Sequence, residues 1–197
     1  MTIQGGIGSY TFGVERASTG LHGPVIRTDE ITAGVGEYPA GLLMAKAADG
    51  KAIPYEEIAA EALGAGDGAV TAFTELLASA PAMPGSVTVT DGVETFSDTG
   101  YGRLVGDAGG SGWVDYKAGQ VSVEFATAPA NEAPVTADYA RALQGVLDEA
   151  VDISKATSAP VVIHGTVKAG LLKINLDGDA PSAGLLRDLR EMGVFPV

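Results

Sequence analysis

Short runs of alternating apolar and polar residues, separated by glycine turns, dominate the pattern of this chain. In one example, Val87 and Val89 alternate with polar residues, an Asp-Gly pair follows, and a second run returns from Val93 to Phe96. Alternation with period two places the apolar side chains on one face of a strand, and Asp-Gly favours a two-residue hairpin turn. The pattern therefore predicts a β-hairpin here and a mainly β chain.

The middle of the chain, residues 66–139, repeats this pattern of strand and turn. Strands are expected at positions 70–77, 86–90, 93–96, 103–105, 113–116, 121–125 and 135–139. About seven short strands in about 75 residues is the spacing of a small β-sandwich. We therefore expect residues 66–139 to form an inserted immunoglobulin-like (Ig-like) sandwich, with its two ends close together as a loop insertion requires.

The two stretches on either side of this segment, 24–65 and 140–197, are predicted to form one small β-rich domain. In the first stretch, an apolar run over 41–45 is followed by an Asp-Gly turn and a short returning run that Pro54 ends. In the second, apolar runs at 161–163 and 166–167 flank Gly165. The middle segment therefore divides this domain into two pieces of sequence.

Two helices are expected in these stretches. Residues 56–63 place their apolar side chains on one helical face, and Gly64 supplies a stop. Near the C-terminus, an apolar stripe runs from Leu185 to Met192 at helical spacing, with Ser182 placed to cap its start and Gly193 its end. The second of these is the stronger pattern, so the chain is expected to carry a short C-terminal helix.

Residues 1–23 are rich in glycine, serine and threonine, with isolated apolar residues between them. Such a segment has too little apolar surface to fold by itself, but enough to add to the strand edge of a partner. We therefore predict an extended N-terminal arm, and an ordinary frayed terminus is the alternative interpretation. The apolar residues of the predicted arm are Ile3, Ile7, Tyr10, Phe12 and Val14.

Composition and charge narrow the classes of function. The chain carries 25 acidic and 12 basic residues, a net charge of −13, and the basic residues are scattered singly. Because such a surface repels phosphate, we expect no nucleic-acid partner. No apolar run approaches the length of a membrane span, and the first residues carry no secretory signal pattern. The absence of cysteine excludes disulfides and thiolate chemistry.

Residues able to support catalysis or metal binding do not cluster in the pattern. His22 and His164 lie too far apart to suggest one site, so we expect no catalytic residues and no enzyme activity. Asp98, Asp107 and Asp115 carry oxygen ligands of the kind that Ca²⁺ binds, but without the spacing of a calcium loop, which favours turn-forming roles. The glycines near residue 5 do not open a helix after a strand, so no phosphate site, cofactor or metal is expected.

Aromatic residues of the middle segment offer a surface for recognition. Trp113 and Tyr116 lie on opposite faces of the predicted strand, so at most one of them shares an exposed surface, and core packing is expected for the other. Tyr101 and Trp113 are the candidates for an exposed aromatic surface able to bind a sugar or a protein.

The flanking stretches resemble the head decoration proteins of tailed bacteriophages, the family of the phage lambda capsid-stabilising protein. The similarity rests on the order and spacing of several motifs over residues 24–60 and 140–197. These motifs are Ala40 to Ala45 with Gly50 to Tyr55, Gly145 to Asp148 followed by Ala159 to Val167, and Leu186 to Pro196. The middle segment is similar to a β-sandwich module of other phage structural proteins, through Pro84 to Thr90, Gly110 to Tyr116, Ala118-Gly119 and Phe125 to Pro129 leading to Ala137 to Tyr139.

This resemblance implies a fold and a function. The fold would be a small decoration domain, β-tulip-like, split by the inserted sandwich. The protein would be made in the cytoplasm of the bacterial host and would bind the major capsid protein as a homotrimer, at three-fold positions on the outer face of the expanded head. The arm would add a strand to the shell, and the insertion would project outward. The alternative is an adhesion or carbohydrate-binding module of the virion surface, which contacts the host through the insertion.

Overall fold

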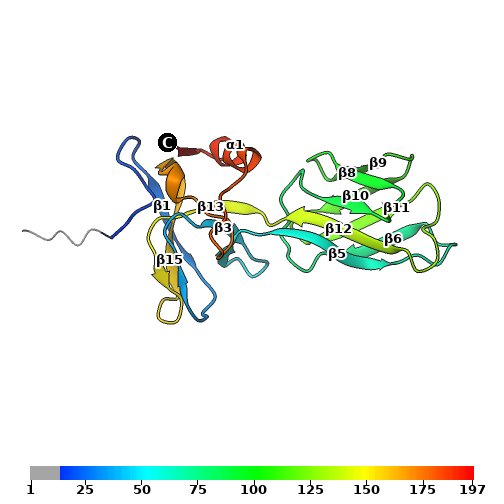
Figure 1. The fold of residues 1–197 in the computed structure, drawn as a ribbon, viewed down its shortest axis with the longest axis horizontal. Coiled ribbons are helices and arrows are strands. Elements are labelled where there is room, and N and C mark those ends of the chain that lie inside the picture. The colour runs from blue at the N-terminus through cyan, green and yellow to red at the C-terminus, as the bar shows by residue number, and fades with distance from the viewer. Residues whose placement is uncertain (1–13) are drawn as a thin grey trace, which may run out of the picture.

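The computed structural model describes residues 14–197 and is mainly β, as the sequence predicts. Its strands form a six-stranded sheet, an eight-stranded sheet and a two-stranded ribbon. The two larger sheets lie at opposite ends of an elongated molecule (Figure 1). They define a flanking unit, residues 14–55 and 141–197, and an inserted unit, residues 57–140.

The sheet of the flanking unit takes its strands from both ends of the sequence. Its order is β1 (Val25–Glu30), β15 (Ser158–Val167), β13 (Leu143–Leu147), β3 (Leu43–Lys46) and β4 (Ala52–Pro54), with β16 (Val194–Pro196) parallel to β15. The ribbon pairs β2 (Glu37–Tyr38) with β14 (Val151–Asp152). Because β15 and β13 lie between β1 and β3, neither stretch of sequence completes the sheet alone.

The predicted C-terminal helix is present as α1 (Ala183–Glu191), which follows the short 3₁₀ helix η1 (Ala169–Leu171). The Ser182 hydroxyl accepts a hydrogen bond from the Leu185 N–H at 3.2 Å and so caps the first turn. Leu185 and Leu189 are buried in the core of the flanking unit, whereas Met192 is partly exposed. In residues 14–197, no helix is long and apolar enough to cross a membrane.

The inserted unit is one continuous sheet that nearly closes on itself. Its strand order is β5 (Glu57–Ala65), β12 (Pro134–Ala140), β7 (Thr88–Thr90), β8 (Thr95–Asp98), β9 (Arg103–Gly106), β10 (Ser111–Asp115), β11 (Gln120–Glu124) and β6 (Ala72–Leu76). Phe125 packs edge-on against Phe96 and Phe73 at the centre of its core. This pairing does not confirm the Ig-like arrangement, in which two separate sheets pack face to face.

The helix predicted over residues 56–63 is wrong, because the structure places strand β5 there. Residues Glu57 to Ala65 pair along their length with β12, and the register shifts within the pair accommodate Ala60 at a φ of 52°. Small apolar residues at helical spacing also fit a strand when a long partner supplies the hydrogen bonds. The inserted sheet therefore begins at Glu57, earlier than the position 66 that the sequence indicates.

The chain enters and leaves the inserted unit at neighbouring points. Glu57, the first residue of β5, lies opposite Ala140, the last residue of β12. The Arg141 guanidinium donates to the Pro54 carbonyl at 3.2 Å and pairs with the Glu56 carboxylate at 3.0 Å, so it joins the two crossing segments. Further backbone hydrogen bonds join residues 81–83 to residues 140–142 across the junction.

Candidate functional site

Residues from Arg16 onward are bound to the flanking unit. Ala17 is fully buried; its N–H donates to the Asp148 carbonyl at 2.7 Å, and its own carbonyl accepts from the Lys168 N–H at 2.8 Å. The Thr19 N–H donates to the Thr166 carbonyl at 2.9 Å. Residues 16–19, the anchor segment, therefore join the end of β15 to the residue that follows β13.

A buried carboxylate holds the anchor segment in place. The Asp148 side chain is 1% exposed, and its Oδ1 accepts a hydrogen bond from the Ser18 N–H at 2.8 Å. Arg16 lies 3.7 Å from Oδ2 and also pairs with Glu149, while Oδ2 itself has no hydrogen bond. Because a buried charge is costly unless it is paired, docking of the anchor segment stabilises Asp148 as much as Asp148 holds the segment.

The predicted arm therefore divides at this anchor. Residues from Arg16 onward are bound to the flanking unit, whereas the prediction continued the arm to residue 23. Val14 is 61% exposed and precedes the anchor segment. The other four predicted arm residues, Ile3, Ile7, Tyr10 and Phe12, lie outside the described residues.

The two aromatic residues singled out from the sequence lie at one surface. Tyr101 is 94% exposed and Trp113 is 46% exposed, and both line a shallow hollow of about 600 Å³ on the inserted unit. Tyr116, which follows the end of β10, is half-buried, packs against the core and donates its hydroxyl hydrogen to Asp98 at 2.6 Å. Burial and this carboxylate raise the pKa of Tyr116 above its usual value. Tyr116 nevertheless also lines the hollow, so the expectation that at most one of Trp113 and Tyr116 shares this surface is wrong.

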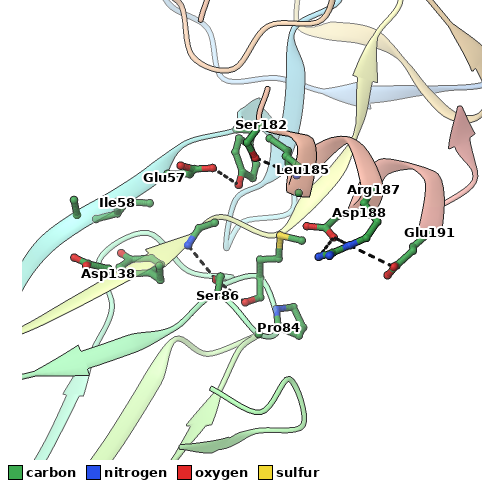
Figure 2. Close-up of a pocket in the computed structure, with 17 residues that line it drawn as sticks. Glu57, Ile58, Pro84, Ser86, Asp138, Ser182, Leu185, Arg187, Asp188 and Glu191 are labelled. Carbon is green, nitrogen blue, oxygen red and sulfur yellow. Dashed lines mark hydrogen bonds and ion pairs between the residues drawn. The ribbon is translucent and has the colours of Figure 1, made fainter. Parts of the chain in front are cut away.

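A second hollow, of about 650 Å³, lies between the two units and was not expected from the sequence. Figure 2 shows α1 on one side of it and the strands that cross between the units on the other. Its lining is mostly apolar and small residues; its charged residues are Glu57 and Asp138 on the side of the crossing strands, and Arg187, Asp188 and Glu191 on α1. Arg187 is paired with Asp188 at 3.2 Å. This groove therefore carries both carboxylates and apolar side chains. Its arginine, Arg187, is paired with carboxylates of its own helix.

The structure brings the two histidines together, so the expectation that they belong to different places is wrong. The Nε2 atoms of His22 and His164 lie 3.2 Å apart. The antiparallel pairing of β1 with β15 places Val25 opposite His164. His22, which precedes β1, is thereby brought next to His164. This pairing joins positions more than a hundred residues apart, and no local pattern signals it.

The three aspartates considered for calcium serve turns and loops. Asp98 accepts from the Gly85 and Gly100 N–H groups, Asp107 accepts from the Thr95 N–H, and Asp115 accepts from two N–H groups of its own turn. These bonds use the carboxylate oxygens locally, as the turn-forming interpretation expects. Among residues 14–197, no group of three or more histidine, aspartate or glutamate side chains is arranged to hold a metal ion.

Comparison with known proteins adds no relative to this picture. Searches of protein-family models, curated proteins and solved structures gave no match to the chain. The anchored N-terminal segment, the aromatic hollow and the groove between the units are therefore the surfaces on which a functional interpretation rests.

Proposed function

We propose that the protein is a phage capsid decoration protein, which binds the major capsid protein on the outer face of the expanded head as a homotrimer. The observation that carries the proposal is the anchor segment. It fixes residue 16 on the flanking unit through Ala17 and the buried Asp148, so the residues before it start from one defined point. Those residues hold the apolar positions expected to bind the shell.

An arm that starts from a fixed point binds more strongly than a free one. An extended segment that adds to a sheet edge gains backbone hydrogen bonds, and it loses less entropy when its root is already ordered. Three arms in one trimer act together, because binding of the first raises the effective concentration of the others. A protein that binds the expanded shell and not its precursor stabilises the expanded state by mass action.

The exposed edge of the flanking sheet supports the proposal that this unit contacts other subunits and the shell. β1 ends the sheet order, and among the described residues β15 is its one strand neighbour. Val25 and Ile26 on this strand are exposed, and Phe195 on the neighbouring part of the sheet is also exposed. An exposed edge strand with apolar side chains is a template for pairing with another chain.

The position of the inserted unit agrees with the proposal that it points away from the capsid shell. Residues 14–30 lie in the flanking unit, at the end of the molecule away from the inserted sheet (Figure 1). If the flanking unit faces the shell, the inserted unit extends into solvent. It would therefore add a second surface to the virion without obstructing the first.

The experiment is co-sedimentation with expanded, undecorated heads of the phage concerned. We expect the full-length chain to saturate the heads and a variant starting at Val14 to lose most of this binding, since the truncation leaves the anchor segment in place. The double variant Tyr101→Ala, Trp113→Ala is the matched control and should sediment like the full-length chain. Failure of the full-length chain to bind the heads would refute the proposal.

The aromatic hollow favours a second function, an adhesion or carbohydrate-binding module of the virion surface. Exposed tyrosine and tryptophan faces stack on sugar rings, and Tyr101 and Trp113 line one hollow. Trp113 is the single tryptophan of the chain, so its fluorescence reports binding directly. A glycan array with the full-length chain and the Trp113→Ala variant would test this function, and signals that are equal for both proteins would count against it.

A further inference from the structure

The two histidines of this chain, His22 and His164, lie next to each other on the flanking unit. The sequence contains two histidines and no cysteine. His22 and His164 are therefore its only side chains of the histidine and cysteine type that bind zinc through nitrogen or sulfur. Their Nε2 atoms face each other at 3.2 Å, with ring centroids 5.2 Å apart and ring planes inclined by 67°. Both side chains are exposed, so this pair is open to ions from solvent.

The distance between the two nitrogens matches that of two ligands of one cation. Histidine nitrogens bind zinc at about 2.0–2.1 Å, and at a tetrahedral angle two such nitrogens are about 3.3 Å apart. The observed 3.2 Å also suits a single N–H···N hydrogen bond between neutral rings. A cation that replaces the shared proton lies to one side of the line between the two nitrogens, so each exposed ring turns to direct its lone pair at the ion.

The backbone of His22 and the ring of His164 are both held by neighbouring groups. The His22 N–H donates to the Thr166 hydroxyl at 3.1 Å, next to the bond from Thr19 to the Thr166 carbonyl. On the other side, His164 packs against Gly193, where an added Cβ would lie 2.5 Å from Nδ1. Gly193 has a φ of 91°, which glycine adopts without strain. Since the backbone of His22 and the ring of His164 are held before binding, a cation has mainly the His22 ring left to order.

We propose that His22 and His164 form a binding site for a late first-row divalent cation such as Zn²⁺, with water completing the coordination. The cation links residue 22 to β15 and so fastens the chain that follows the anchor segment. Its positive charge is favoured by a protein of net charge −13. The site stands independently of the proposed capsid function, because it rests on the flanking unit alone.

Titration calorimetry with Zn²⁺ on the chelator-treated full-length chain tests the site. We expect one Zn²⁺ per chain, and we expect His22→Gln and His164→Gln each to weaken binding by roughly tenfold or more, since even loss of an outer partner of a metal ligand costs about 10–100-fold. Cu²⁺ and Ni²⁺ should bind more tightly than Zn²⁺, while Mg²⁺ should give no signal that depends on the histidines.

Two outcomes would overturn the proposal. One is equal Zn²⁺ affinity in the unsubstituted chain and both variants, which would assign the metal to surface carboxylates. The other is the absence of saturable Zn²⁺ binding by the unsubstituted chain. Circular dichroism establishes that the variants are folded, and the histidine ring resonances in NMR spectra provide a second readout, because Zn²⁺ should shift the signals of both rings together.

Discussion

Asp148→Asn is the substitution that most directly probes how the N-terminal segment is held. Asparagine has nearly the same shape as aspartate, removes the negative charge and replaces one carboxylate oxygen with an NH₂ group. In the native chain, the carboxylate accepts the Ser18 N–H at 2.8 Å and lies 3.7 Å from the Arg16 guanidinium. The amide oxygen can still accept from Ser18, but the amide group no longer attracts Arg16.

The expected loss follows from these two contacts. A hydrogen bond to a charged group is worth about 1.5–3 kcal/mol and one between neutral groups about 0.5–1.5 kcal/mol, so the first contact loses about 1 kcal/mol. Arg16 is more than half exposed and its pair with Asp148 is long, which limits the second contact to about 0.5–1 kcal/mol. We therefore expect docking of the anchor segment to weaken by about 1–2 kcal/mol, roughly 5–30-fold in the docking equilibrium.

Trypsin cleavage after Arg16 measures this equilibrium, because the bond between Arg16 and Ala17 is held against the flanking unit until the segment opens. Cleavage should accelerate by the same factor in Asp148→Asn. Ser18→Ala is the matched control: the native hydrogen bond comes from the backbone N–H of residue 18, so cleavage should change little. If Asp148→Asn is cleaved at the native rate, the buried carboxylate does not hold the segment.

Three further predictions concern the two cores. Glu94 is buried and accepts N–H groups with both oxygens, from Gly110 at 2.6 Å and Ala126 at 2.8 Å, so Glu94→Gln should destabilise the inserted unit by about 2–3 kcal/mol in urea unfolding. Leu189→Ala should cost the flanking unit about 2–5 kcal/mol by the same measurement, because Leu189 is fully buried, and a change below about 1 kcal/mol would contradict its place in the core. Burial and the neighbouring Glu57 raise the pKa of Tyr55. At pH values at which the unfolded chain loses the hydroxyl proton of Tyr55, the folded chain therefore keeps it. The contribution of Tyr55 to stability is then complete below about pH 10 and falls as the pH rises above it, and Tyr55→Phe should show a shallower decline of unfolding free energy in that range.

Local patterns predicted the elements whose hydrogen bonds are local. Helix α1 appears where its capping residues indicate, and β7 and β8 form the predicted hairpin, but its loop is the four residues 91–94 and not the predicted two-residue turn. The alternation correctly predicted that Trp113 is exposed and Tyr116 contacts the core, but both residues line one hollow, because β10 ends at Asp115, before Tyr116. In each case the residues that decide the structure are neighbours in sequence.

Other features depend on pairings between distant parts of the chain. The local pattern of β5 indicates a helix, but the strand that decides its conformation lies 69 to 83 residues later in the chain, from Ala65↔Pro134 (134 − 65) to Glu57↔Ala140 (140 − 57). The burial of Asp148 also depends on a distant partner, since its carboxylate accepts the N–H of Ser18, 130 residues earlier in the chain. The contact of His22 with His164 had no such signal, since it depends on the register of β1 against β15.

The junction between the two units has a consequence for how this protein can evolve and be engineered. Glu57 and Ala140 lie opposite each other, and Arg141 ties both crossing segments to the flanking unit. A short turn can close so small a gap at little entropic cost, and so can any domain whose ends are adjacent. The flanking unit can thus accept different inserted domains at this junction. The same junction is a suitable site for inserting an enzyme, an epitope or an affinity tag.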